Sequence, residues 1–346
     1  MELYEDGIGL HKVKRDTFLF QPADFNHLER GEIMPEARFI YSFSYDYHHR
    51  DLCRLECRQM FQQEEEGKVL FSDVEIDPSI SPFLLARFEI ITEAKSYDKL
   101  LPLIRKQLLR TEGFKVDYLS LEGDPARFEE RKQKMKEVGF CIFAAPDFKN
   151  PSMVYSICTH EGMWYFGKLK RHDGAWRKHN NKPYSFSNSI CMHIGKSLVG
   201  IASEGDKSKT LLDACCGAGT ILLEGCIGGF NIEGSEINPK TYYGTKKNLL
   251  HYQYEPNLYL SDVAQVEKEY DAIIIDLPYN LYSRSTDEIT AHIIEAAARM
   301  SPRVIIVSIV DISATIEAAG LNVQDYCTVE KRGYSKFARS IWVCER

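Results

Sequence analysis

The sequence has little of what would place it in a membrane or in an export pathway. None of its apolar runs reaches the roughly 20 residues that a membrane-spanning helix needs. Three of its first six residues are acidic, and this start lacks the basic and apolar regions of a signal peptide. We therefore expect a cytoplasmic protein that does not insert into a membrane.

Patterns for disulfides and metals are also scarce. The ten cysteines are scattered through apolar contexts of a 346-residue chain, which indicates reduced thiols rather than a disulfide framework. The closest cysteines are the Cys53/Cys57 pair and the adjacent Cys215 and Cys216, and neither pair has the spacing of a zinc finger. The ten histidines include no H-E-x-x-H motif, so the sequence predicts no metal site.

What is present indicates a globular chain of two or three domains. Apolar residues make up 44% and charged residues 27%, which excludes a disordered or fibrous protein. The net charge of −7 argues against a nucleic-acid partner, but residues 84–182 contain 19 Lys/Arg and 13 Asp/Glu. This positive middle indicates a local site for a polyanion, or equally a solvated basic face.

A glycine turn organises the second half of the sequence. The apolar residues Leu211 and Leu212 lead to Asp213, the turn carries Gly217 and Gly219, and an apolar helical run follows. This order predicts the first strand, loop and helix of a nucleotide-binding sheet, in which glycine lets the backbone approach a ligand closely. An isolated G-x-G is also common in plain tight turns. The residues at the ends of the other strands therefore have to distinguish a cofactor site from a turn.

Two further strands end in acidic residues. Glu236 follows the glycine turn by about twenty residues, the spacing at which a carboxylate can accept both ribose hydroxyls of a nucleoside. A buried strand at residues 270–275 then delivers Asp276, Leu277, Pro278 and Tyr279 to the carboxyl edge of the sheet. Open α/β sheets bind their ligands at this edge.

The combination resembles the amino-methyltransferases that use S-adenosylmethionine and carry an Asp/Asn-Pro-Pro-Tyr motif, over residues 182–346. Leu277 departs from the motif, in which a proline is usual, but Pro278 biases Leu277 toward extended conformations. The resemblance implies a Rossmann-like class I methyltransferase sheet, S-adenosylmethionine as cofactor, and Asp276, Leu277, Pro278 and Tyr279 as catalytic residues. The cofactor-binding residues that it implies are Asp213, Cys216, Gly217, Gly219, Glu236, Ile237, Asp262 and Val263.

The segment before the sheet predicts an ordinary helix start. Residues 183–189 precede a helix at about 190–201, for which Asn188 or Ser189 would serve as N-cap. In the resembled family the same segment folds back over the methionine end of the cofactor. Both roles are compatible.

The first half of the chain predicts a smaller α+β module. Strands are expected at 38–45, 68–76, 84–92, 114–121, 140–145, 153–158 and 163–169, with helices at 51–63, 97–110 and 126–138 and a hairpin turn at Glu161 and Gly162. Placed before a methyltransferase, residues 37–180 resemble a THUMP domain with its ferredoxin-like neighbour. That resemblance implies binding of the end of tRNA.

Cations and an aromatic residue gather at the end of this module, at 168–178, and they suit phosphates and base stacking. A basic linker between two domains would look similar. A second group lies at 331–339, in the loop of a predicted closing hairpin, beside the expected substrate mouth. The RNA-binding residues predicted from the two segments are Lys168, Lys170, Arg171, Trp176, Arg177, Lys178, Arg332, Lys336 and Arg339.

These observations predict an α/β enzyme with an irregular lead-in at 1–36, a ferredoxin-like and THUMP-like module at 37–180 and a methyltransferase domain at 181–346. The expected reaction is methylation of the exocyclic N2 amine of a guanine in tRNA. Alternatives are a DNA adenine or cytosine amino-methyltransferase, a protein glutamine methyltransferase, and a non-catalytic RNA-binding protein. The sequence leaves open whether a small activating protein subunit is needed.

Overall fold

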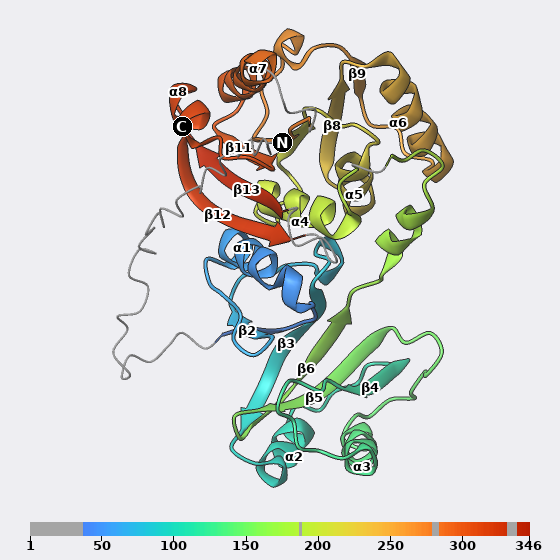
Figure 1. Ribbon diagram of the computed structural model, residues 1–346. Coiled ribbons are helices and arrows are strands. Elements are labelled where there is room, and N and C mark those ends of the chain that lie inside the picture. The colour runs from blue at the N-terminus through green and yellow to red at the C-terminus, as the bar shows by residue number, and fades with distance from the viewer. Residues whose placement is uncertain (1–36, 187–188, 279–283, 331–337) are drawn as a thin grey trace, which may run out of the picture. The chain divides into compact units, whose positions relative to one another are not determined.

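The computed structural model describes residues 37–186, 189–278, 284–330 and 338–346, with side chains from 287 on in the third range. Two β-sheets organise these residues (Figure 1). The predicted lead-in at 1–36 lies outside the described residues, and the division of the chain at residue 180 stays a prediction.

The first sheet has six strands in the order β2-β1-β3-β6-β5-β4. β4 and β5 are parallel, and the other pairs are antiparallel. Glu161 and Gly162 form the β5–β6 turn, both with positive φ, as the sequence predicts. The elements are β1 (Phe39–Phe43), α1 (Arg50–Phe61), β2 (Val69–Ser72), β3 (Leu84–Ala94), α2 (Tyr97–Lys106), β4 (Phe114–Tyr118), α3 (Phe128–Gly139), β5 (Met153–His160) and β6 (Met163–Arg171).

The strand predicted at 140–145 is wrong. The chain there turns after α3, and burial does not alternate as it would along a strand, because the consecutive Cys141 and Ile142 are both buried and the flanking Phe140 and Phe143 are exposed. The aromatic residues that suggest a strand therefore have no sheet face to cover. Phe143 instead donates its backbone N–H to the carbonyl of Leu109 in the loop after α2.

The second sheet has seven strands in the order β12-β13-β11-β10-β7-β8-β9. All pairs are parallel except those of β13, which runs antiparallel to β11 and β12. The elements are α4 (Met192–Ser203), β7 (Thr210–Asp213), α5 (Thr220–Gly228), β8 (Asn231–Glu236), α6 (Pro239–Tyr252), β9 (Leu258–Leu260), β10 (Ala272–Asp276), α7 (Arg284–Met300), β11 (Arg303–Ser308), α8 (Ser313–Ala318), β12 (Asn322–Glu330) and β13 (Ala338–Glu345).

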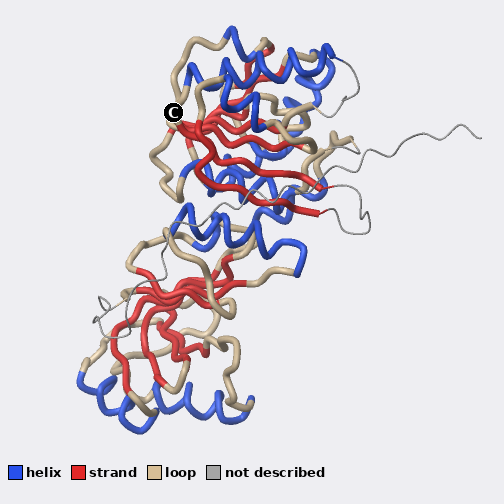
Figure 2. The backbone as a smooth tube through the Cα atoms, turned by 60° about the vertical axis from the view of Figure 1, so that its left-hand side comes forward, coloured by secondary structure: helices blue, strands red, loops and turns tan. Residues whose placement is uncertain are grey.

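Helices cover both faces of this second sheet (Figure 2). Alternate residues of the central strands point to opposite sides, because side chains along a strand alternate between the faces. Ile274 packs in one core with residues of α4 and α5, and Ile273 and Ile275 pack in the other with residues of α7 and α8. The predicted Rossmann-like α/β fold is therefore confirmed, and the α+β module before it is consistent with the prediction.

Helix α1 connects the first sheet to the second. It shares a hydrophobic core with α4, and its Arg58 donates to both carboxylate oxygens of Asp325 on β12 at 2.8 Å. Arg303 of β11 donates in turn to the Gln59 side chain at 2.6 Å. Bidentate arginine contacts and apolar packing thus fix α1 against the second sheet.

The start of α4 differs from the expectation. Its N-cap is Cys191, without a side-chain hydrogen bond, and not Ser189, whereas Asn188 lies outside the described residues. Ser189 instead uses its hydroxyl to accept from the backbone N–H of Phe186. Within the described ranges, none of the helices is long and apolar enough to cross a membrane.

Candidate functional site

Two strand ends meet where the order of the second sheet reverses. From β7 the chain proceeds to β8 and β9 on one side, then returns to β10 and β11 on the other. Asp213 ends β7 and Asp276 ends β10, and Asp213 pairs in register with Ile274, two residues before Asp276. A reversal point at the carboxyl edge is where open α/β sheets bind ligands.

Asp213 is a buried carboxylate without a counterion. Its side chain is fully buried, and neither carboxylate oxygen has a hydrogen-bond partner among the described residues. Burial raises the pKa of Asp213 well above its usual value, and the nearby Asp276 and Glu236 raise it further. Such a group is costly unless a cation reaches it, so the site fits a ligand that brings an ammonium or sulfonium charge.

The loop after β7 is held open by its glycines and by α6. Gly217 and Gly219 have φ of 53° and 74°, values that favour glycine. A Cβ at Gly219 would lie 2.7 Å from the side chain of Thr245, whose hydroxyl donates to the carbonyl of Gly217. Cys216, one of the predicted cofactor-binding residues, donates its backbone N–H to the carbonyl of Ser235 at 3.0 Å. Its thiol is buried, which raises its pKa and keeps it protonated.

Glu236 joins the end of β8 to this loop. One carboxylate oxygen accepts from the backbone N–H of Gly217 at 3.0 Å and the other from that of Asn238 at 2.8 Å. Each oxygen keeps a lone pair for a further donor, so both can still accept from a ribose diol. The neighbouring Ile237 is 66% exposed and offers an apolar surface beside the diol position.

Asp262 has a partner that the sequence did not reveal. It caps the turn after β9 by accepting from the backbone N–H of Ala264 at 2.9 Å, and both its oxygens lie 3.1 Å from Nε2 of His292 on α7. Val263 is buried beneath it. The residue therefore has a fixed orientation at the mouth of the site, and only the packing of α7 could show this.

The departure at Leu277 has a structural explanation. Its side chain is buried in the core with Ile275, and its backbone N–H donates to the carbonyl of Val307 at 3.1 Å. A proline at this position would lack that N–H. The leucine thus extends the β10–β11 ladder by one bond, Pro278 follows it at the surface, and Tyr279 lies outside the described residues.

Asn248 of α6 ties the segment before α4 to the glycine loop. Its side chain accepts from the backbone N–H of Tyr184 at 2.8 Å and donates to the carbonyls of Tyr184 at 2.8 Å and Ala218 at 2.9 Å. The ring of Phe186 then lies 3.4 Å from the position a Cβ would take at Gly217. The sequence analysis did not predict a role for Asn248, because the only signal is a polar residue on the buried face of a helix.

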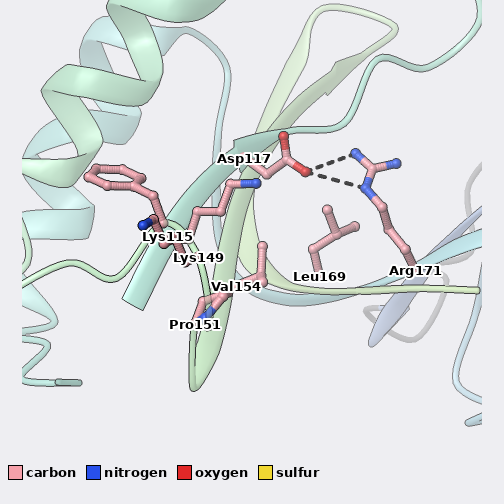
Figure 3. A pocket seen from close by; sticks show the side chains of 8 residues that line it. Lys115, Asp117, Lys149, Pro151, Val154, Leu169 and Arg171 are labelled. Atoms are coloured by element: carbon pink, nitrogen blue, oxygen red, sulfur yellow. Dashed lines mark hydrogen bonds and ion pairs between the residues drawn. The ribbon is translucent and has the colours of Figure 1, made fainter. Parts of the chain in front are cut away.

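The first sheet carries a separate cationic cavity of about 250 Å³, shown in Figure 3. Lys115 of β4, Lys149 of the loop before β5 and Arg171 of β6 line it, together with the 72% exposed ring of Phe148. Arg171 donates to Asp117 at 3.1 Å, whereas no carboxylate partner of either lysine is found in the part of the chain that the structure describes.

The loop that carries Phe148 and Lys149 is held at both ends. Asp147 accepts from the backbone N–H groups of Lys149 and Asn150 at 2.8 and 3.0 Å. The Ser152 hydroxyl donates to the carbonyl of Glu112 at 2.6 Å, across the edge of β4. The aromatic ring and the ammonium group are therefore presented on a preorganised turn.

The predicted RNA-binding residues divide into three groups. Lys168, Lys170 and Arg171 pair with Glu89, Asp77 and Asp117 at 3.4, 2.9 and 3.1 Å. Arg177 and Lys178 are exposed. The remaining predicted residues are the buried Trp176 and Arg339, and Arg332 and Lys336, which lie outside the described residues.

Trp176 requires a correction. It is 4% exposed and packs edge-on against His193 with ring centroids 4.9 Å apart, so its ring is not available for stacking on a base. The sequence could not distinguish an exposed from a buried tryptophan in a basic segment. No group of metal-ligating side chains occurs within the described ranges.

The part of the chain that contains most of the second sheet is similar to known methyltransferases. Residues 181–335 match the family model described as "RMKL-like, methyltransferase domain". A tRNA (guanine(10)-N2)-dimethyltransferase of Methanothermobacter thermautotrophicus is 28% identical over 124 residues, which are 34% of this chain and 36% of that enzyme. The alignment thus spans about a third of the relative.

Solved structures also match over most of the chain. TrmN from Thermus thermophilus gives a TM-score of 0.46 at 14% identity and covers 89% of this chain and 99% of that one. A protein from Listeria monocytogenes that is described as a predicted N6-adenine-specific DNA methylase gives a TM-score of 0.43 at 13% identity. The match covers 88% of this chain and 95% of that one. The match over residues 181–335 is to a methyltransferase domain, in agreement with the methyltransferase expected from the sequence.

Proposed function

We propose, from the premise that residues 181–335 form a methyltransferase domain, that the protein methylates the exocyclic N2 amine of a guanine in tRNA. The observation that carries the proposal is the neighbouring position of Asp213 and Asp276 at the strand-order reversal of the second sheet. Asp213 is buried and pairs with no cation in the part of the chain that the structure describes, and Asp276 stands where a substrate amine can be positioned.

S-adenosylmethionine supplies an activated methyl group on a positively charged sulfur. The residues that would hold it follow the predicted set: Asp213 faces the positive end, the glycine loop lets the backbone approach, and Glu236 accepts from the ribose. Asp262 and Ile237 would contact the adenine. The anionic surroundings match the charge of this cofactor, which supports the assignment.

Asp276 and Leu277 would orient the nucleophile. The lone pair of an exocyclic amine is delocalised into the base, so the amine is a poor nucleophile until it is positioned. A carboxylate at Asp276 and the carbonyl of Leu277 can accept its two N–H groups, and Asp276 can take up developing positive charge. The predicted stacking role of Tyr279 stays with the proposal, and the base must leave its helix to reach the site.

The first module supports RNA as the substrate. Its cavity combines an exposed phenylalanine with two lysines that have no carboxylate partner among the described residues. This combination binds a backbone phosphate and stacks on a base. We keep the THUMP-like role for residues 37–180, with Lys168, Lys170, Arg171, Arg177 and Lys178 as phosphate contacts. The archaeal relative named as a tRNA methyltransferase points in the same direction.

The test is methyl transfer by the purified chain. Isotope-labelled S-adenosylmethionine is incubated with total tRNA, with duplex DNA and with a protein extract, and the products are digested and analysed by mass spectrometry. We expect labelled N2-methylguanosine from tRNA. Labelled methyladenine or methylcytosine in DNA would favour a DNA enzyme, and labelled glutamine would favour a protein methyltransferase.

A separate binding measurement completes this test. Calorimetry should show S-adenosylmethionine binding to the chain alone, and Glu236→Ala should weaken it by about 1–3 kcal/mol, the cost of losing hydrogen-bond acceptors. Cofactor binding without methyl transfer to any of the substrates would indicate that a small activating protein subunit is needed. Absence of cofactor binding would contradict the proposal.

A further inference from the structure

A second cavity, of about 190 Å³, lies where four segments of the chain converge, and the segment at 82–85 contributes only apolar side chains. The segment after β1 contributes Asp46 and His49, the segment after β6 contributes His172 and Arg177, and α4 contributes His193. None of these residues belongs to the methyl-transfer site described above. Three imidazoles and one guanidinium thus line a single small space.

The imidazoles are fixed by their neighbours. The rings of His49 and His193 are stacked, with centroids 5.3 Å apart and planes 14° apart, and the edge-on Trp176 supports the ring of His193. His49 Nδ1 lies 3.0 Å from a carboxylate oxygen of Asp46. The burial of Trp176 therefore has a structural reason, since it orients a ring of this cavity.

Arg177 has no counterion among the described residues. Its guanidinium lies 5.8 Å from the ring centroid of Trp176, and no carboxylate lies within ion-pair distance. Lys170 and Arg171, a few residues earlier, are each paired with an aspartate. Asp46, the carboxylate in the lining of the cavity, lies against His49, so among the described residues the guanidinium of Arg177 is left available to an external anion.

Burial, and after it the positive surroundings, lower the pKa values of two of the imidazoles. Desolvation and then Arg177 lower the pKa of His172, which Asp173 opposes, and desolvation, His49 and Arg177 lower the pKa of His193, which Asp46 opposes. An anion in the cavity would reverse these effects, and the rings would then bind protons and donate. The charged and titratable groups around the two rings are Asp46, His49, Arg171, Asp173, Arg177 and Lys196.

We propose that this cavity binds a phosphate group, held by the guanidinium of Arg177 and by the rings of His172 and His193. A guanidinium offers a planar pair of donors that fits phosphate oxygens, and protonated imidazoles complete the tetrahedral set. The phosphate belongs either to the backbone of a bound RNA or to a small phosphorylated molecule. The site deepens the proposed function and, for an RNA phosphate, rests on it, because Arg177 is one of the phosphate contacts proposed there.

The direct test follows the histidine ring signals by NMR during a pH titration, with inorganic phosphate or with chloride. Phosphate should raise the pKa of His172 and His193. Its affinity should increase about tenfold or more between pH 8 and pH 6, since binding is coupled to proton uptake. Arg177→Ala should abolish the effect, whereas Arg110→Ala, which removes an exposed arginine lining neither cavity, should preserve it.

Two further variants keep the test decisive if Arg177→Ala disturbs the fold. His172→Gln and His193→Gln should each bind phosphate more weakly at pH 6 and flatten its pH dependence. An unchanged titration in phosphate would overturn the proposal, as would equal losses in Arg177→Ala and Arg110→Ala. S-adenosylmethionine binding by the same variants reports on the methyltransferase site, so the two proposals can fail separately.

The source of the phosphate is decided with a short single-stranded RNA. If the RNA shifts the same ring signals and loses affinity in Arg177→Ala, the site holds a backbone phosphodiester. If only inorganic phosphate shifts them, the site holds a small phosphorylated ligand. Both outcomes support a phosphate site, and a response to neither probe would contradict it.

Discussion

The two sheets of this protein carry sites of opposite charge. At the carboxyl edge of the second sheet, Asp213, Glu236, Asp262 and Asp276 form an acidic site, and Asp213 is buried without a partner among the described residues. On the first sheet, Lys115, Lys149 and Arg171 surround a cavity beside an exposed phenylalanine. An acidic site suits a cationic cofactor and an amine, and a basic site suits a polyanion.

The difference shows how a chain with a net charge of −7 can serve an RNA substrate. The negative charge gathers in part where a positively charged cofactor is expected, and the positive charge gathers on the module expected to hold the RNA. If this division is correct, variants of the acidic site should alter cofactor binding or catalysis alone. Variants of the cationic cavity should alter RNA affinity alone.

The largest effect is expected at Asp276. Asp276→Ala should lower the rate of methyl transfer by about 100-fold or more, because a positioned proton acceptor is lost. Cofactor and RNA affinities should stay within about twofold, as equilibrium binding and single-turnover rates would show. The control is Asp311→Asn, which changes an exposed aspartate after β11. Normal turnover in Asp276→Ala would mean that this motif only ends a strand.

Replacing Asp213 should lower the affinity for the cofactor and raise the stability of the cofactor-free protein. Asp213→Asn should weaken S-adenosylmethionine binding by roughly 1–3 kcal/mol, through loss of the buried negative charge. The same variant should raise the melting temperature of the cofactor-free protein, because an unpaired buried carboxylate is costly. Calorimetry and thermal unfolding measure the two effects, and a lower melting temperature would contradict the assignment.

The pH dependence of this stabilisation has a definite sign. The pKa of Asp213 is higher in the folded than in the unfolded chain, so the folded state binds a proton more tightly. Wild-type stability is then lost as the pH rises through the folded pKa. The advantage of Asp213→Asn should therefore grow from pH 4 to pH 8, and a constant difference would contradict burial of this group.

Phe148 tests the cationic cavity. Phe148→Ala should weaken the binding of single-stranded RNA by about 1–3 kcal/mol if a base stacks on the ring. The matched control is Phe128→Ala, since Phe128 is 75% exposed on α3 but does not line the cavity. Fluorescence anisotropy would measure both. Equal losses in the two variants would indicate a general apolar effect rather than a stacking site.

The smallest effect is expected for the salt dependence of RNA binding. Lys149→Ala should reduce the slope of log affinity against log salt concentration by about one, the value for one lost phosphate contact. Lys132→Ala, an exposed lysine of α3 outside the cavity, should leave the slope nearly unchanged. An unchanged slope in Lys149→Ala would remove this lysine from the RNA-contacting set.

The acidic site could largely be predicted because its residues lie in short contiguous motifs. Asp213 and Gly219 belong to one strand-loop-helix unit, and Asp276 and Leu277 end one buried strand, so local periodicity places each on the sheet edge. The hydrogen bond from Leu277 to Val307 was not predictable, because its acceptor lies on the neighbouring strand. The orienting roles of Asn248 and His292 were missed for the same reason.

The sequence by itself determined the alternating strands and helices and the acids at strand ends, because those depend on local periodicity and on the common direction of parallel strands. Only the tertiary structure decided which basic and aromatic side chains meet. It brings Lys115 and Arg171 together across three strands, and it buries Trp176 against His193. Such contacts join residues far apart in the chain, and side-chain exposure depends on packing that no local pattern encodes.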